Sequence, residues 1–225
     1  MDGLWPFRLR PPGFMFHGMY QPSARSVAVP ASAKRLQQLI DERLHTDAAG
    51  KAAVDRRIWD LFGERWAVMF TDLSGFSRRV AEFGIIHFLQ VIQQSVRILT
   101  PIIDQHDGIL LKIEADSLLV IFRRPERAVA CSVAMQRALA EFNKPLAPED
   151  RILLCVGLGW GDVLRIGDQD VFGAQVNAAS KLGEDMAKAG EILVTGEVKD
   201  ACPTATWAPY DEIPPGATSA WRLVD

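Results

Sequence analysis

The sequence predicts an α+β fold, a ferredoxin-like βααββαβ sheet domain with an N-terminal helical extension, on the basis of three observations. First, short apolar runs typical of strands alternate with longer stretches that carry apolar residues at helical spacing. Second, the order of these runs after residue 63 is that of a split βαβ arrangement. Third, the chain shows no internal repeat. One sheet with its helices packed on one face is therefore the simplest architecture.

The first part of the chain, residues 1–32, is proline-rich and has no clean period. We expect an irregular arm there; alternatively, Met19 is the true start. Residues 33–63 change to a helical pattern, in which Leu36 and Leu39 belong to one apolar stripe. We expect two helices, which form either a regulatory element or a simple cover for an open face of the main domain.

The main domain is expected over residues 64–225, and its elements follow from the same periodicity. Pro125 suits the first turn of a helix, and Gly190 suits the residue after one. The expected elements are, in order, a strand over 66–72, two helices over 78–107 that break near Gly84, two strands on either side of Asp116, a helix over 125–144, a strand, a glycine-rich bend and a second strand over 151–167, a helix over 173–190 closed by Gly190, and strands over 191–195 and 219–225.

Composition excludes several classes of protein. The chain has 225 residues, 48% of them hydrophobic and 24% charged, which is ordinary for a globular protein. Its net charge of −3 offers no electrostatic basis for binding nucleic acid. The 3 cysteines are odd in number and have no CxxC spacing, which fits a reducing compartment. No apolar run reaches the roughly 18 residues of a membrane-spanning helix. We therefore expect a cytoplasmic protein with neither a membrane nor a nucleic acid partner.

Two acidic residues at strand ends suggest a metal site. Asp72 ends the first predicted strand, and Asp116 lies in the turn between the next two. Two carboxylates at one edge of a sheet repel each other, and a divalent cation such as Mg²⁺ removes that repulsion. Gly75 allows close approach of the backbone to a phosphate before the helix that begins near Ser77. The alternatives are that Asp72 caps this helix and that Asp116 is an ordinary turn residue.

Three segments, FTDLSGF, KIEADSLLVIF and DVFGAQVNAASKL, resemble motifs of the class III nucleotide cyclases, the adenylyl and guanylyl cyclases, of a soluble bacterial type. The resemblance covers roughly residues 64–224. It implies that Asp72 and Asp116 hold two Mg²⁺ or Mn²⁺ ions per site, with the backbone of Leu73 as a further metal ligand. It also implies that the backbone of the turn contacts the substrate phosphates, through Leu73, Ser74, Gly75 and Phe76.

The same resemblance places Lys112 and Asp170 where the family reads the base. Adenine has an acceptor at N1 and an amine at N6, so a lysine and a carboxylate match it, whereas guanine presents the opposite pattern. Alternatively, Lys112 only reaches solvent, and Asp168 competes with Asp170 for the role. Glu114 lies on the same side of its strand as Lys112, which predicts that it either orients the lysine or weakens its charge.

The resemblance also assigns Asn177 to positioning the ribose and Lys181 to the phosphates. The family usually has arginine at the second position, and lysine lacks its bidentate geometry. Pro215 stands where many members have a lysine, and Ala115 stands where glycine is usual before the metal-binding aspartate. The two changes near the phosphates remove or weaken positive charge.

These inferences together predict an adenylyl cyclase that converts ATP to 3′,5′-cyclic AMP and pyrophosphate. In the family, metal residues come from one chain and base, ribose and phosphate residues from the other. The resemblance therefore implies a homodimer with two composite active sites. Two alternatives remain at this point: a cyclase for GTP or a pyrimidine triphosphate, and a weakly active or inactive nucleotide-binding dimerisation module.

Overall fold

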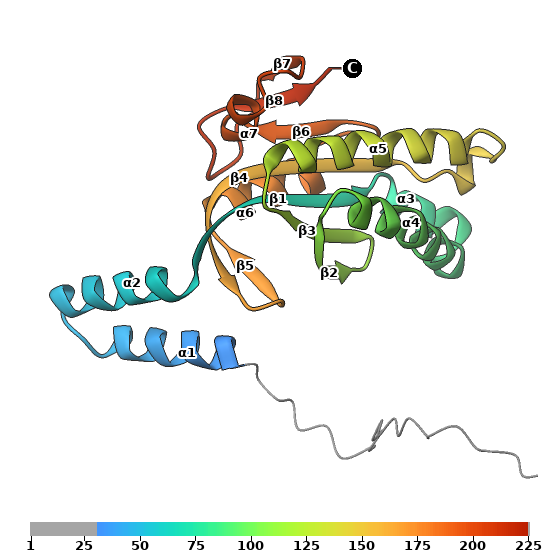
Figure 1. Ribbon diagram of the computed structural model, residues 1–225. Coiled ribbons are helices and arrows are strands. Elements are labelled where there is room, and N and C mark those ends of the chain that lie inside the picture. The colour runs from blue at the N-terminus through green and yellow to red at the C-terminus, as the bar shows by residue number, and fades with distance from the viewer. Residues whose placement is uncertain (1–30, 225) are drawn as a thin grey trace, which may run out of the picture.

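The structure is a computed structural model that describes residues 31–224, except for the side chains of residues 76–79. The predicted arm over 1–32 therefore lies almost entirely outside the described residues. The elements are α1 (Ala31–Leu44), α2 (Ala48–Phe62), β1 (Gly63–Leu73), α3 (Phe76–Phe83), α4 (Ile85–Gln105), β2 (Ile109–Glu114), β3 (Ser117–Phe122), α5 (Pro125–Asn143), β4 (Leu154–Ile166), β5 (Asp170–Phe172), α6 (Ala174–Ser180), β6 (Ile192–Thr195), α7 (Gly196–Ala201), β7 (Trp207–Tyr210) and β8 (Ala220–Leu223), with a 3₁₀ turn at Pro148–Asp150 and a π-helical turn at Lys181–Met186 (Figure 1).

One sheet organises the domain, with the strand order β2-β3-β1-β4-β6-β8-β7 and with β5 paired to β4. All pairs are antiparallel except β4 with β6. Strand β1 is longer than predicted because it pairs with β4 along its whole length, from Gly63 opposite Leu164 to Leu73 opposite Leu154. The predicted α+β class is confirmed, and so is the helix break at Gly84.

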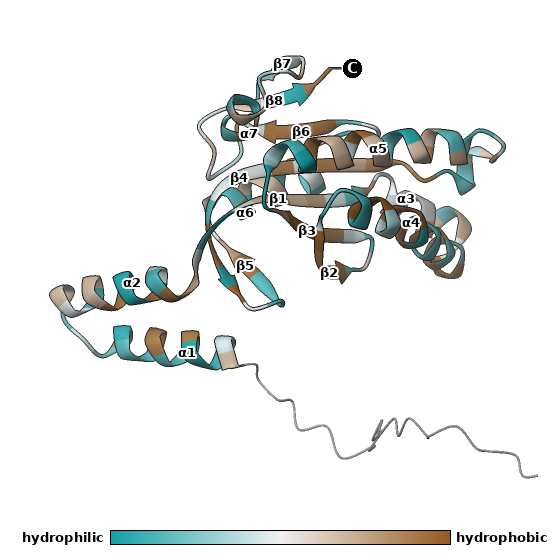
Figure 2. Ribbon diagram, in the orientation of Figure 1, coloured by the Kyte–Doolittle hydropathy of each residue, from teal (hydrophilic) through white to brown (hydrophobic). Residues whose placement is uncertain are grey.

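Helices cover both faces of the sheet, and the expectation of a single helical face is wrong. On one face, α4 and α5 bury Phe88, Ile103 and Met135 against the strands. On the other face, Val176 and Ala179 of α6 pack in a second apolar cluster with residues of β1 and β3. Figure 2 shows apolar residues concentrated on the strands between these layers. The sheet is consequently buried on both sides where α6 crosses it.

Strand β4 is one continuous strand from Leu154 to Ile166 where the sequence led us to expect two strands separated by a glycine-rich bend, so that prediction is wrong. Gly157, Gly159 and Gly161 alternate along β4 and therefore share one face. A Cβ atom at Gly157 would lie 2.1 Å from the carbonyl oxygen of Ala179, and one at Gly159 would lie 2.3 Å from that of Gln175. These glycines thus allow α6 to approach the sheet at backbone distance, which is a packing role and not a turning role.

The helix expected over 173–190 is also shorter than predicted. It runs as α-helix to Ser180 and as a π-helical turn to Met186, after which Ala187 is extended. Gly190 has φ of 83° but lies in the turn that leads to β6, where its amide bonds to the carbonyl of Leu154 at 2.8 Å. Helix α7 and strand β7, between β6 and β8, have no counterpart in the sequence prediction.

The two predicted N-terminal helices are present and form a hairpin that extends beyond one end of the sheet (Figure 1). Leu39 of α1 and three residues of α2 bury their side chains together with Ile166 of β4. The N-cap Asp47 accepts a hydrogen bond from the amide of Gly50 at 2.8 Å, and Arg43 pairs with Asp55 across the hairpin at 2.5 Å. No helix within residues 31–224 combines the length and hydrophobicity needed to cross a membrane.

Candidate active site

Two carboxylates meet at one end of the central strands. Asp72 lies near the end of β1, opposite Cys155 of β4, and Asp116 lies in the turn between β2 and β3, the strand next to β1. Burial and then the charge of Asp116 raise the pKa of Asp72 to about 6, while a hydrogen bond from the backbone of Leu73 lowers it. Burial also raises the pKa of Asp116. The predicted pair is therefore brought together, with its negative charges partly desolvated.

The structure removes one alternative for Asp72. The residue that precedes α3 is Gly75, which has φ of 88°, and no side chain caps that helix. Asp72 is thus not the helix cap. No ion pair among the described side chains includes Asp72 either. Two neighbouring carboxylates with raised pKa values fit a hard divalent cation, which prefers oxygen ligands and lets waters and phosphates complete its shell.

Two further carboxylates, Glu184 and Asp185, lie near this pair and were missed in the sequence. The charge of Glu184 raises the pKa of both Asp72 and Asp116. Glu184 accepts hydrogen bonds from Ser117 Oγ at 3.0 Å and from Ser180 Oγ. Both residues lie in the π-helical turn. The sequence feature that could have indicated this turn is Gly183, because a Cβ atom there would lie 2.7 Å from the carbonyl oxygen of Phe70. Within residues 31–224, however, no three His, Cys, Asp or Glu side chains form a ready metal-binding cluster.

The turn after β1 is only partly free to bind phosphate. The amide of Ser74 already donates to the carbonyl oxygen of Leu153 at 2.8 Å. The amide of Leu73 is directed to the carboxylates of Asp72 and Asp116. Two of the four amides predicted to contact phosphates, those of Leu73 and Ser74, are therefore engaged within the chain.

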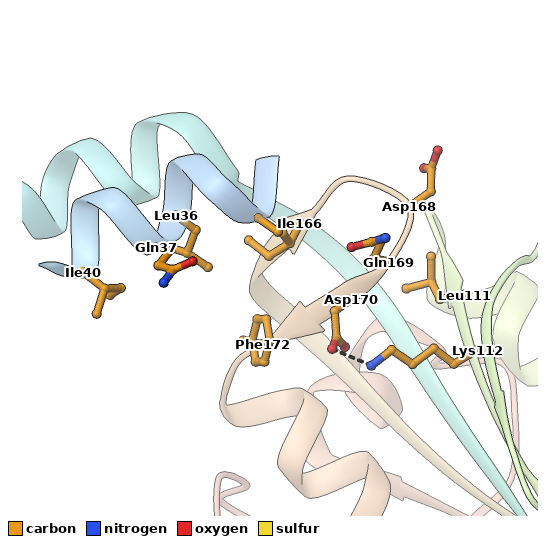
Figure 3. Close-up of a pocket in the computed structure, with 11 residues that line it drawn as sticks. Leu36, Gln37, Ile40, Leu111, Lys112, Ile166, Asp168, Gln169, Asp170 and Phe172 are labelled. Carbon is orange, nitrogen blue, oxygen red and sulfur yellow. Dashed lines mark hydrogen bonds and ion pairs between the residues drawn. The ribbon is translucent and has the colours of Figure 1, made fainter. Parts of the chain in front are cut away.

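The predicted base-reading pair is assembled within one chain. Lys112 Nζ lies 2.5 Å from Asp170 Oδ2, joining β2 to β5 (Figure 3). Asp168, the competing residue, instead pairs with Arg165 at 2.8 Å and has a side chain that is 88% exposed. Glu114 lies 3.8 Å from Lys112 Nζ, so it is a weaker second partner. The fold thus selects Asp170 as the carboxylate that meets Lys112.

Asn177 and Lys181 lie one helical turn apart on α6 and the π-helical turn, and both are exposed. Lys181 donates to Asp185 at 2.8 Å, a hydrogen bond that raises the pKa of the lysine. The ammonium group of Lys181, which the sequence places near the phosphates, is therefore paired within its own π-helical turn.

Gln175 is a second residue that sequence reasoning missed. Its buried side chain accepts from the amide of Trp160 at 3.2 Å and from Thr195 Oγ1 at 2.8 Å, and it donates to the carbonyl of Gly216 at 3.3 Å. It thereby ties α6 to β4, to β6 and to the loop that contains Pro215. No motif marks it, because its role depends on three segments that are distant in sequence.

Ala115, immediately before Asp116, adopts a left-handed conformation with φ of 53°. Residues with a Cβ pay about 1–2 kcal/mol for that conformation, and glycine does not. The departure from the glycine usual in the resembled motif is therefore a local strain next to Asp116, and the backbone path itself is kept.

Residues 63–209 match the family described as the adenylate and guanylate cyclase catalytic domain. The chain belongs to this family. The cyclase domain is 34% identical over 131 residues to the serine/threonine-protein kinase pkn2 of Myxococcus xanthus and 32% identical over 135 residues to putative adenylate cyclase 3 of Rhizobium meliloti. These alignments cover 58% and 60% of this chain but only 16% and 22% of the two relatives. An adenylate cyclase of Mycobacterium tuberculosis is 27% identical over 192 residues, 78% of this chain and 42% of the relative.

Solved structures show the same fold. An adenylate/guanylate cyclase/hydrolase from Silicibacter pomeroyi superposes with a TM-score of 0.62 at 22% identity, covering 72% of this chain and 99% of the other. The adenylyl cyclase CyaB from P. aeruginosa superposes with a TM-score of 0.60 at 19% identity, covering 72% and 95%. The nucleotide cyclase fold of this chain is thereby established, and the predicted family is confirmed.

The raised pKa of Asp72 gives this cyclase domain a predictable response to pH. Its pKa is about 6 in the folded protein against an ordinary value of 3.8, so the folded state holds this proton more tightly than the unfolded chain does. The resulting stability is complete below about pH 4 and is lost as the pH rises through about 6. Asparagine cannot titrate, so we expect the stability of the metal-free Asp72→Asn protein to depend less on pH between about pH 4 and pH 6.

Thermal unfolding between pH 4 and pH 8, with a chelator present, measures the effect. The matched control is Asp104→Asn, an exposed aspartate of α4. Equal pH slopes for the wild type and Asp72→Asn would contradict the desolvation of Asp72.

Proposed function

We propose that the chain is an adenylyl cyclase that converts ATP to 3′,5′-cyclic AMP and pyrophosphate. The observation that carries the proposal is the Lys112–Asp170 pair, which holds one donor and one acceptor 2.5 Å apart. The N1 acceptor and the N6 amine of adenine are adjacent, so this pair matches them, while guanine would leave both protein groups unsatisfied. The relatives named adenylate cyclase support the same substrate.

Asp72 and Asp116 are the residues that would hold two Mg²⁺ or Mn²⁺ ions, with the backbone of Leu73 as a further ligand. When bound, such ions lower the pKa of the ribose 3′-hydroxyl and neutralise charge on the α-phosphate. The positive charge of a cation would offset the costs of ionising these carboxylates, because the charge of Asp116 raises the pKa of Asp72 and burial raises the pKa of both.

The remaining proposed roles are binding and orientation. Asn177 positions the ribose by hydrogen bonding, and Lys181 meets the phosphates once it exchanges its partner Asp185 for them. Amides of Gly75 and Phe76 contact the triphosphate at the start of α3. Placing the 3′-hydroxyl in line with the α-phosphate is the largest contribution that such groups can make.

We propose a homodimer in which each site takes its metal residues from one chain and its base, ribose and phosphate residues from the other. Large apolar side chains are exposed on the strands that carry the Lys112–Asp170 pair, at Ile113 (47%) and Phe172 (50%). A second copy covering this face would bury them. A guanylyl cyclase domain from Blastocladiella emersonii with the same fold, at a TM-score of 0.60, is described as a non-canonical dimer, so a domain of this fold can pair with a second copy.

A nucleotide-binding dimerisation module with little turnover is the second candidate. The observation that favours it is the ion pair between Lys181 and Asp185, which engages the one cation assigned to the leaving pyrophosphate. Pro215, in place of a lysine, supplies no charge there either.

Turnover with ATP, GTP, CTP and UTP, each with Mg²⁺ or Mn²⁺, separates these candidates. We expect cyclic AMP from ATP, with an efficiency at least about tenfold above that for GTP, because a mismatched base leaves buried polar groups unpaired. Changing Lys112 and Asp170 together to alanine is expected to erase most of this ratio. Asp168→Ala, in the same loop but paired away from the site, is the matched control and should leave the ratio unchanged. Equal efficiency with ATP and GTP in the wild type would refute the assignment of adenine.

A further inference from the structure

The loop between β7 and β8 contacts both ends of the helical stretch formed by α6 and the π-helical turn. At one end, the hydroxyl of Tyr210 donates to the carbonyl oxygen of Met186 at 3.1 Å. At the other end, the side-chain amide of Gln175 donates to the carbonyl oxygen of Gly216 at 3.3 Å. The residues between these two contacts, the 211–216 segment, are therefore held along the helical stretch.

Gly216 brings this segment into backbone contact with α6. Its φ of 95° lies in the left-handed region that favours glycine, and a Cβ atom there would lie 2.3 Å from the carbonyl oxygen of Ala174. The amide that meets Gly216 is itself fixed, because the side-chain oxygen of Gln175 accepts from the amide of Trp160 and from Thr195 Oγ1. Gln175 is 8% exposed and Thr195 is 0% exposed. These hydrogen bonds fix the direction of the Gln175 amide, and Gly216 is the point that it holds.

Glu212 lies within the 211–216 segment and is exposed. Its charge acts on Lys181: the hydrogen bond to Asp185 is the main cause that raises the pKa of this lysine, and the charge of Glu212 adds a smaller increase. Lys181 thus lies in the field of carboxylates from two segments, its own turn and the loop. Both carboxylates have the sign of charge of a phosphate, so both oppose the binding of a phosphate at the lysine.

We propose that Gln175 is a positioning residue that holds the 211–216 segment against α6, and that Glu212 on this segment weakens the binding of phosphates at Lys181. Gln175 acts through the loop and touches no reacting group. The role of Glu212 rests on the proposed function, because it uses the phosphate role of Lys181. The role of Gln175 in holding the segment does not depend on that function.

Amide hydrogen exchange of the full chain, followed by mass spectrometry of the peptide 211–219, tests the role of Gln175. Gln175→Glu keeps both acceptor contacts but has no donor for Gly216, and at about pH 8 these contacts favour its charged form. Gly216→Ala leaves Gln175 intact and places a Cβ atom against α6. Both variants are expected to exchange about three- to tenfold faster in this peptide, the range for one hydrogen bond.

Gly190→Ala is the matched control for backbone strain. Gly190 has a similar φ of 83°, but no atom of residues 31–224 lies within 4 Å of the position that its Cβ would take. Its exchange in the peptide 211–219 should equal that of the wild type. Unchanged exchange in Gln175→Glu and Gly216→Ala, or an equal increase in Gly190→Ala, would overturn the role of Gln175.

Calorimetric binding of an ATP analogue that lacks the 3′-hydroxyl, with Mg²⁺ present, tests the role of Glu212 without turnover. Glu212→Gln is expected to tighten binding about two- to fivefold, the range for one exposed charge pair. Gly216→Ala should give a similar gain. Adding Glu212→Gln to Gly216→Ala should give no further gain, because the carboxylate is already displaced from Lys181.

Asp211→Asn is the matched control for charge. Asp211 is the neighbouring carboxylate and is not among the charges that shift the pKa of Lys181, so its removal should leave the affinity unchanged. Equal affinities of Glu212→Gln and the wild type, or an equal gain in Asp211→Asn, would overturn the role of Glu212. A wild-type protein that binds no analogue would overturn the proposed function and the role of Glu212 with it, while the exchange result would still decide the role of Gln175.

Discussion

Asp72→Ala and Asp116→Ala are each expected to reduce cyclic AMP formation to below about one-thousandth of the wild-type rate at saturating Mn²⁺. The loss of a metal ligand removes charge stabilisation worth several kcal/mol in the transition state, and each 1.36 kcal/mol is about tenfold in rate. Neither residue carries packing, since both are only partly buried and lie at strand ends. The fold should therefore remain intact.

Initial rates of cyclic AMP formation, with far-ultraviolet circular dichroism as a check on folding, measure this prediction. Asp104→Ala, on the exposed side of α4, serves as the control and should retain full activity. A folded Asp72→Ala protein with near wild-type activity would show that the metal site has been placed wrongly.

Mixing two inactive variants, Asp72→Ala and Asn177→Ala, is expected to restore activity to roughly a quarter of the wild-type level. In a two-fold symmetric dimer with divided sites, a mixed dimer carries both defects in one site and none in the other. Random exchange makes about half of the dimers mixed, and each then has one working site of two. Activity of the mixture should rise as subunits exchange.

The separate variants, incubated under identical conditions, provide the baseline for this experiment. Exchange is verified independently by pulling down one tagged variant and detecting the other. If exchange is complete and the mixture stays inactive, the site is built within a single chain, and the division of roles between Asp72 and Asn177 is wrong.

Local sequence patterns predicted most of the fold, and the motifs predicted the Lys112–Asp170 pair of the candidate site. Alternation and helical spacing located the strands on either side of Asp116, and the break at Gly84, within one or two residues of their observed bounds. Such patterns are reliable because they depend on one face of each element being buried. The resemblance of three motifs, and the spacing from Asp170 to Asn177, selected the carboxylate that the structure brings to Lys112.

The errors concern residues whose role depends on a partner distant in the chain. Gly157 and Gly159 suggested a bend, because glycine often marks a turn, but in the fold they admit the backbone of α6. The prediction of a regular helix up to Gly190 failed because the π-helical turn fits closely over β1 at Gly183. Periodicity reports which side of an element is apolar and cannot report how closely another backbone approaches it.

Residue patterns and motifs were sufficient to predict an α+β cyclase domain with an acidic pair and a lysine–aspartate pair. The surroundings of these pairs became visible in the folded chain: the carboxylate of Glu184 lies near Asp72, and α1 lines the cavity at Lys112. Residue identity and spacing are properties of the unfolded chain as well. Desolvation, charge proximity and cavity volume, in contrast, arise only when segments far apart in sequence are packed together.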